Sequence, residues 1–123
     1  DGYIRIVGRM KDMIIRGGEN IYPSEIEEYL YTHPGVAEVQ VIGVPSEHYG
    51  EEVVAWIKPM PNVHLDGDTL STFCRGAIAT YKIPRYWKIV DLFPMTVTGK
   101  VQKYRMREIS ETELQQNGND NPG

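Results

Sequence analysis

The chain has 123 residues, 41% of them hydrophobic and 24% charged, so it is long enough for one core and too short for two substantial domains. Its net charge of -4 and pI near 5.3 argue against a nucleic-acid or anionic-membrane surface that works by bulk electrostatics. A single cysteine, Cys74, excludes an internal disulfide framework and is compatible with a reducing compartment, the cytosol or an organelle matrix.

The beginning of the chain predicts a short strand, a hairpin and a helix. The segment YIRIVGR alternates like a strand, and in DMIIRGGENIYP two β-prone runs flank Gly17 and Gly18, a strong signal for a two-residue turn with positive φ. In PSEIEEYLYTHPG, Ser24 and Glu27 have the spacing of a capping box, and Pro34 with Gly35 ends a helix of roughly two to three turns. The start, DGYIRIVGRMKD, has no signal-peptide core and suggests a piece of something longer.

The middle of the chain predicts the sheet and a second helix. VAEVQVIGV and EEVVAWIKPM are two strands joined by the turn-rich PSEHYG, and the second is so continuously apolar that we expect it to be central. DTLSTFCRGAIATY then predicts an amphipathic helix with Asp68 as its N-cap. Its apolar face comprises Leu70, Phe73, Cys74, Ala77 and Ile78.

The last third predicts a strand in RYWKIVDLFP, a turn in MTVTGK and a short final helix in VQKYRMREIS. From residue 111 the composition becomes polar and rich in Asn, Gln and Gly, which predicts a disordered tail over 111–123 after a single domain over 1–110. No apolar run approaches the roughly 20 residues that span a bilayer, so we expect a soluble chain without a transmembrane segment.

Familiar catalytic patterns are absent from the sequence. The three histidines lack metal-ligand spacing, Cys74 lies on an apolar helix face, no serine lies in GxSxG, and RGGEN is neither a Walker loop nor a GxGxxG fingerprint. The sequence therefore predicts no metal site and no covalent hydrolase. What remains is a set of cations able to bind phosphate, or simply to be solvated: Arg9, Lys11, Arg16, Lys82, Arg85, Lys100, Lys103, Arg105 and Arg107.

Four segments, in this order and spacing, resemble the C-terminal domain of the adenylate-forming acyl-CoA synthetases, the superfamily of luciferase and nonribosomal peptide adenylation domains. They are GRMKDMIIRGGENIYPSEIE, GEEVVAWI, YKIPRYWKIV and PMTVTGKVQKYRMRE, and the first is most similar to medium- and long-chain fatty acyl-CoA ligases. The resemblance runs from about Asp1 to Glu108. It implies an α+β fold: a small mixed sheet of about three strands, two to three flanking helices and an N-terminal two-stranded hairpin.

The resemblance also implies a two-step ligase reaction. A carboxylic (fatty) acid and ATP with Mg²⁺ give an acyl-adenylate and pyrophosphate, and coenzyme A then displaces AMP to give acyl-CoA. ATP and Mg²⁺ would be held mainly by a large N-terminal domain that this chain lacks, so we expect the chain to be inactive alone. No nucleic-acid partner is implied.

Individual positions carry over from the family's motifs. Lys100 matches the adenylation lysine and Arg9 a nucleotide-contacting arginine, while Lys11 matches a hinge near 9–12 about which the domain would rotate between the two half-reactions. Gly17, Gly18 and Glu19 match the hairpin that enters the active site on the CoA side. The segment Ile83, Pro84 and Arg85 matches a second CoA contact, whereas Asn20 replaces an arginine found in some relatives.

Two other interpretations remain open at this point. The first is an adenylation domain that loads a carrier protein instead of free CoA, although QQNGNDNPG gives no sign of a following carrier domain. The second is a non-catalytic α+β binding module that kept the fold without the chemistry.

Overall fold

The computed structural model describes residues 13–116 of the chain. Its elements are β1 (Ile14–Arg16), β2 (Glu19–Ile21), α2 (Pro23–Leu30), β3 (Val36–Ser46), β4 (Gly50–Pro59), α3 (Gly67–Cys74), the 3-10 helix η1 (Thr80–Lys82), β5 (Tyr86–Ile89) and α4 (Lys103–Gln116). The predicted fold class is confirmed, because a two-stranded hairpin and a mixed three-stranded sheet are combined with three α-helices in this part of the chain.

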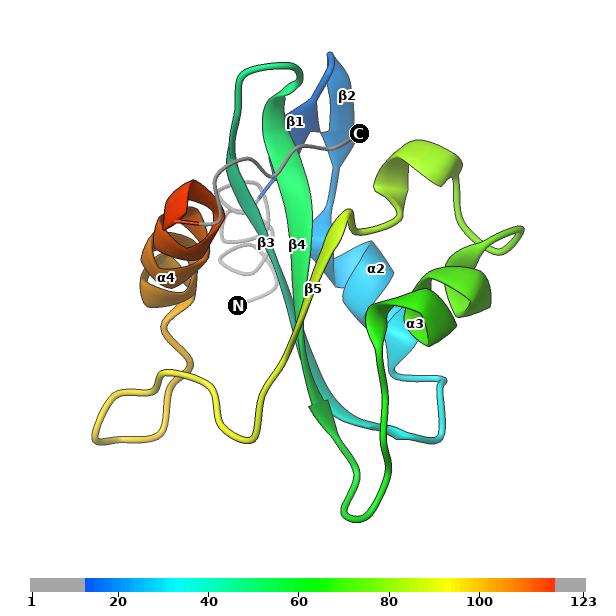
Figure 1. Ribbon diagram of the computed structural model, residues 1–123, viewed down its shortest axis with the longest axis vertical. Helices are drawn as coiled ribbons and strands as arrows, with labels where there is room; N and C mark the ends of the chain where they lie inside the picture. The colour runs from blue at the N-terminus through cyan, green and yellow to red at the C-terminus, as the bar shows by residue number, and fades with distance from the viewer. Residues whose placement is uncertain (1–12, 117–123) are drawn as a thin grey trace, which may run out of the picture.

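The larger sheet has the strand order β3-β4-β5 (Figure 1). β3 and β4 form an antiparallel hairpin, and β5 returns through α3 and η1 to lie parallel to β4. The apolar run of β4 is therefore central, as its sequence predicted. Every residue from Glu52 to Ile57 is buried in that strand.

Both faces of this sheet are covered, which explains why β4 does not alternate between apolar and polar residues. Val53, Ala55 and Ile57 face one core together with residues of α2 and α3. Val54 and Trp56 face a second core, which includes Met106 of α4. Figure 1 shows the same arrangement, with α4 on one side of the sheet and α2 and α3 on the other.

The start of each of the first two α-helices differs from the prediction. Ser24 is not an N-cap: α2 begins at Pro23, and its N-cap, Tyr22, makes no side-chain cap bond. Proline has no backbone N–H, so at the first helical position it leaves no N–H group that needs a cap. In α3 the N-cap is Asp66 rather than Asp68, since Asp66 Oδ1 accepts the Thr69 N–H at 2.8 Å.

Two helix ends also differ from the prediction. α3 ends at Cys74, so Ala77 and Ile78 do not continue its apolar face, and Gly76 with φ of 81° redirects the chain. α4 has 14 residues and reaches Gln116, so the expectation of a disordered tail is wrong for residues 111–116. The expected strand over 3–9 and the remaining tail over 117–123 lie outside the described residues.

The glycine hairpin is confirmed. Gly17 and Gly18 have φ of 58° and 87°, the positive pair that a tight turn between β1 and β2 requires. None of the helices within residues 13–116 is both long and apolar enough to cross a membrane.

Candidate functional site

Lys100 follows a tight turn that is held by its own hydrogen bonds. Thr96 N–H donates to the Lys100 carbonyl at 2.9 Å, and Gly99 N–H donates to the Thr96 carbonyl at 2.9 Å. The hydroxyl Oγ1 of Thr96 accepts the Lys100 N–H at 3.1 Å. Gly99 has φ of 91°, which a residue with a side chain rarely adopts. The backbone at Lys100 is thus fixed by local hydrogen bonds, and all three of them involve Thr96.

The side chain of Lys100 is exposed and, within residues 13–116, its ammonium has no hydrogen-bond or ion-pair partner. Val97 at the tip of the same turn is fully exposed, and Leu92 and Met95 in the segment before it are exposed as well. An ordered turn whose exposed ammonium is not held by any described residue can deliver one positive charge to another surface.

The glycine hairpin lies against the turn between β3 and β4. Gly17 N–H donates to the Tyr49 carbonyl at 2.8 Å. A Cβ at Gly17 would lie 3.2 Å from the Tyr49 ring, whereas a Cβ at Gly18 would meet nothing within 4 Å. Glu19, the first residue of β2, is exposed. Gly17 therefore faces the domain, while Gly18 and Glu19 face outward.

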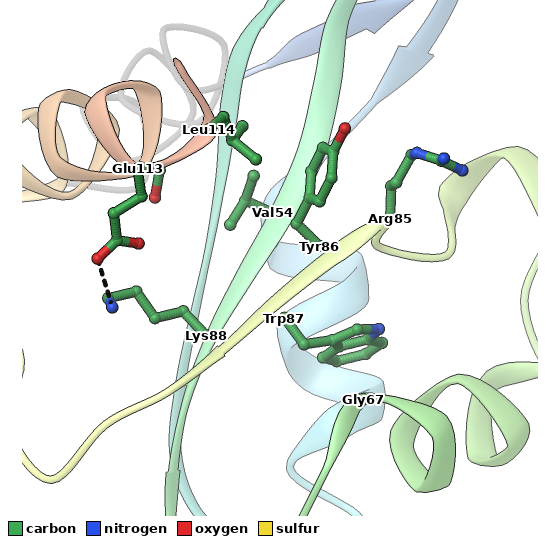
Figure 2. Close-up of a pocket in the computed structure, with 9 residues that line it drawn as sticks. Val54, Gly67, Arg85, Tyr86, Trp87, Lys88, Glu113 and Leu114 are labelled. Carbon is green, nitrogen blue, oxygen red and sulfur yellow. Dashed lines mark hydrogen bonds and ion pairs between the residues drawn. The ribbon is translucent and has the colours of Figure 1, made fainter. Parts of the chain in front are cut away.

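The segment from Ile83 to Arg85 leads into β5. Ile83 packs against the core beside α2 and α3, Pro84 is buried, and Arg85 is exposed. Of these three, only Arg85 lines a pocket of about 370 Å³ at the edge of β5. Figure 2 shows this pocket between residues of β5 and of α4, including Lys88 paired with Glu113 at 2.8 Å.

Lys100 and the glycine hairpin lie at opposite ends of the sheet. The hairpin contacts Tyr49 next to the start of β4, and Arg85 N–H donates to Val53 at the same end at 2.9 Å. β5 then runs parallel to β4 until Ile89 pairs with Ile57, and the Lys100 turn follows from there. Figure 1 shows the hairpin at the top and the loop after β5 at the lower left. The predicted CoA-side residues thus share one end, and Lys100 lies at the other.

The lysines and arginines that the sequence analysis grouped together differ in whether they form an ion pair. Arg16 pairs with Glu52 at 2.7 Å, Lys82 with Glu25 at 2.9 Å, and Lys103 with Glu27 at 3.0 Å. Arg85, Lys100, Arg105 and Arg107 form no ion pair with residues 13–116. Among the nine cations, these four are the ones within residues 13–116 that no ion pair occupies, and Arg9 and Lys11 lie outside that range.

Cys74 and His33 are engaged in packing and hydrogen bonding within the fold. Cys74 is completely buried, and burial raises the pKa of its thiol to about 11. His33 Nδ1 accepts the Gly35 N–H at 2.9 Å, and its ring packs edge-on against Phe73. In the part of the chain that the structure describes, no three His, Cys, Asp or Glu side chains are placed to hold a metal ion.

Arg9, Lys11 and the hinge expected near 9–12 lie outside the described residues. Sequence reasoning missed the partners of Arg16, because Glu52 is 36 positions away and no local pattern links the two. It also missed Thr96, although threonine hydroxyls in turns commonly bond to nearby backbone groups.

A family model described as the AMP-binding enzyme C-terminal domain matches residues 25–100. Among curated relatives, the chain is 58% identical over 108 residues to the putative acyl-CoA synthetase YngI of Bacillus subtilis, covering 88% of this chain and 20% of YngI. It is 50% identical over 112 residues to the mitochondrial medium-chain acyl-CoA ligase ACSF2 of Danio rerio, covering 91% of this chain and 18% of ACSF2. The chain therefore spans about a fifth of the length of these relatives.

Solved structures agree in fold. Apo MatB from Rhodopseudomonas palustris superposes with a TM-score of 0.79 at 38% identity, covering 84% of this chain and 21% of MatB. The ATP-bound form of MatB gives a TM-score of 0.79 at 37% identity, covering 83% of this chain and 20% of MatB.

Proposed function

The chain belongs to the AMP-binding enzyme C-terminal domain family, and from this premise we propose that it is the mobile C-terminal domain of an ATP-dependent fatty acyl-CoA ligase. The relatives support this proposal, because YngI is named as an acyl-CoA synthetase and ACSF2 as a medium-chain acyl-CoA ligase. The structural observation that carries it is the separation of Lys100, which forms no ion pair with any described residue, from the glycine hairpin at the other end of one small sheet.

The reaction has two steps. A carboxylate oxygen of the fatty acid attacks the α-phosphorus of ATP, an O–P bond forms, and pyrophosphate leaves with the electron pair of the broken P–O bond. The sulfur of coenzyme A then attacks the acyl carbon, the thiol loses its proton, and AMP leaves with the electrons of the broken C–O bond. One domain with two functional ends can serve both steps if it turns between them.

Lys100 serves the first step. Negative charge gathers on the oxygens around the α-phosphorus as the carboxylate attacks, and a compact ammonium on a flexible stem stabilises that charge. The Lys100 backbone is fixed by the turn, and its side chain has no partner among residues 13–116, so the ammonium can reach the reaction without breaking an ion pair within that range. Arg9 is proposed to contact the nucleotide in the same pose.

The hairpin serves the second step. Gly18 has open space where a Cβ would lie, so the backbone can approach a ligand closely there. We assign the CoA side to the hairpin residues Gly17, Gly18 and Glu19 and to the segment from Ile83 to Arg85. A rotation about Lys11 would exchange this end of the domain for the Lys100 end.

ATP and Mg²⁺ are proposed to be held mainly by an N-terminal domain. The described residues do not fit a metal ion, since they contain no cluster of three metal-binding side chains. No step of the mechanism assigned to this domain runs through Mg²⁺. We place the enzyme in the cytosol or in an organelle matrix.

Product analysis tests the proposal. The full-length enzyme carrying this domain should convert medium- or long-chain fatty acid, ATP and CoA into acyl-CoA, AMP and pyrophosphate, measured by chromatography. The isolated chain should give no ATP–pyrophosphate exchange, because the acyl and ATP pockets are elsewhere. Transfer of the acyl group only to a phosphopantetheinyl carrier protein, or exchange by the isolated chain, would contradict it.

A further inference from the structure

The glycine hairpin is too small to hold its own shape. β1 and β2 have three residues each, and an isolated two-stranded hairpin is marginally stable in water at best. The orientation of Gly17 and Gly18 must therefore be set by the surface on which the hairpin lies.

That surface makes two side-chain contacts with Arg16, the last residue of β1. Arg16 Nε donates to Glu52 Oε2 at 2.7 Å. The Arg16 guanidinium also lies 3.8 Å from the centre of the Tyr49 ring, within the range of a cation–π contact. Arg16 is the residue directly before Gly17, so these contacts fix the chain where the turn begins.

Two backbone groups of the hairpin are bound by the same surface. Gly17 N–H donates to the Tyr49 carbonyl at 2.8 Å, and Ile15 N–H donates to Glu51 Oε1 at 2.7 Å. We call Arg16, Tyr49 and Glu52 the hairpin clamp, because their side chains join the hairpin to the start of β4.

Glu52 is a rigid anchor for the clamp. It is one of two buried polar or charged residues in the described part of the chain, with 3% of its surface exposed. Its Oε2 also accepts the Val53 N–H at 3.1 Å, so the carboxylate is fixed to the β4 backbone. A buried carboxylate needs a cationic partner, and Arg16 supplies it. Arg16 is consequently committed to the clamp and is not free to bind a phosphate.

We propose that Arg16, Tyr49 and Glu52 are positioning residues for the thioester-forming step, an inference that rests on the CoA-side role proposed for the hairpin. The clamp holds Gly17 against Tyr49 and thereby presents Gly18 outward. The Lys100 end of the domain does not depend on it, because the Lys100 turn is held by Thr96 and lies beyond the far end of β5.

Two substitutions at Tyr49 separate positioning from general stability. Tyr49→Leu removes the ring that faces Arg16, whereas Tyr49→Phe keeps it; the Tyr49 hydroxyl has no partner within residues 13–116. Glu52→Gln removes the anchoring charge. Glu38→Gln is the matched control, because the Glu38–Lys58 pair on the same sheet is exposed and 3.8 Å long.

The two half-reactions are measured separately in the full-length enzyme, adenylation by ATP–pyrophosphate exchange and thioester formation from supplied acyl-adenylate and CoA. Tyr49→Leu and Glu52→Gln should lower kcat of thioester formation by about 100-fold, the size expected when a group is misplaced by about 1 Å. Adenylation should stay within about twofold, which also reports that the domain is folded. Tyr49→Phe and Glu38→Gln should match the wild type in both assays.

Equal losses in both half-reactions, or no loss in either, would overturn the positioning role. Gly18→Val shows which proposal has failed. If Gly18→Val slows thioester formation while Tyr49→Leu and Glu52→Gln do not, the clamp is wrong and the CoA-side role stands. If Gly18→Val leaves thioester formation unchanged, the CoA-side role of the hairpin itself is wrong.

Discussion

Replacing Thr96 by valine removes two side-chain hydrogen bonds from the Lys100 turn and leaves its backbone bonds in place. Valine has nearly the shape of threonine and no hydroxyl, so the bond from Lys100 N–H to Thr96 Oγ1 at 3.1 Å is lost, as is the 2.9 Å contact with Thr98 Oγ1. The backbone bonds from Thr96 N–H and Gly99 N–H, each 2.9 Å long, remain. Of the two lost bonds, only the one from Lys100 N–H holds the lysine itself, and one exposed hydrogen bond contributes about 0.5–1.5 kcal/mol.

This free energy sets how large a fraction of molecules have the turn closed, with Lys100 in place for the reaction. We expect Thr96→Val to slow adenylation by about twofold to about twelvefold, since about 1.4 kcal/mol corresponds to a factor of about ten. Thioester formation should be unchanged, and the free energy of unfolding should fall only slightly, because the turn is at the surface. ATP–pyrophosphate exchange and single-turnover thioester formation in the full-length enzyme measure the two steps.

Thr96→Ser is the control, since serine keeps the accepting hydroxyl. The reasoning fails if serine is as slow as valine, if valine matches the wild type, or if valine slows both half-reactions equally.

Three further predictions concern the scaffold. Trp56→Phe should lower the free energy of unfolding by about 1–3 kcal/mol, since Trp56 Nε1 donates to the buried Ser110 Oγ at 2.9 Å, and adding Ser110→Ala should recover part of that loss in denaturant titrations. Burial raises the pKa of the Cys74 thiol from 9.0 to about 11. The stability that the buried neutral thiol contributes is therefore complete below pH 9.0 and is lost as the pH rises toward 11. Cys74→Ala should not show this loss of stability at alkaline pH. The hydrogen bond from the Thr69 N–H lowers the pKa of Asp66 below 3.8. Asp66→Ala should therefore destabilise α3 above pH 3.8, and the effect should shrink as the pH falls below it. Amide exchange of Thr69 measures this.

Local chemistry made several features predictable from sequence. The pair Gly17 and Gly18 specifies its own turn, because few other residue pairs adopt two consecutive positive φ angles. The run from Val53 to Ile57 specifies a central strand, because a strand with only one buried face would alternate.

Helix limits were less predictable because neighbouring residues compete for the same role. Asp66 and Asp68 are both good N-caps, and the buried Leu65 just before Asp66 favours the earlier start. The polar end of α4 looks like a tail by composition, yet Leu114 packs on the second core and Glu113 pairs with Lys88. Tertiary contacts stabilise this helix where its composition does not.

The candidate site was predictable where a residue acts alone and not where residues act together. Lys100 lies on the exposed turn that its sequence indicated. The clamp joins Arg16 to Glu52 across 36 positions, and the sequence alone placed Arg16 among the free cations. Only the fold distinguishes a paired arginine from an available one.

The central claim is that one end of this domain serves adenylation and the other end serves thioester formation. Lys100→Ala in the full-length enzyme tests it most directly, with acyl-adenylate formation and thioester formation from supplied acyl-adenylate measured side by side. The predicted result is loss of acyl-adenylate formation with thioester formation preserved, because in the proposed mechanism the Lys100 ammonium contacts only the first transition state. Equal loss of both half-reactions, or full retention of acyl-adenylate formation, would contradict this division of roles.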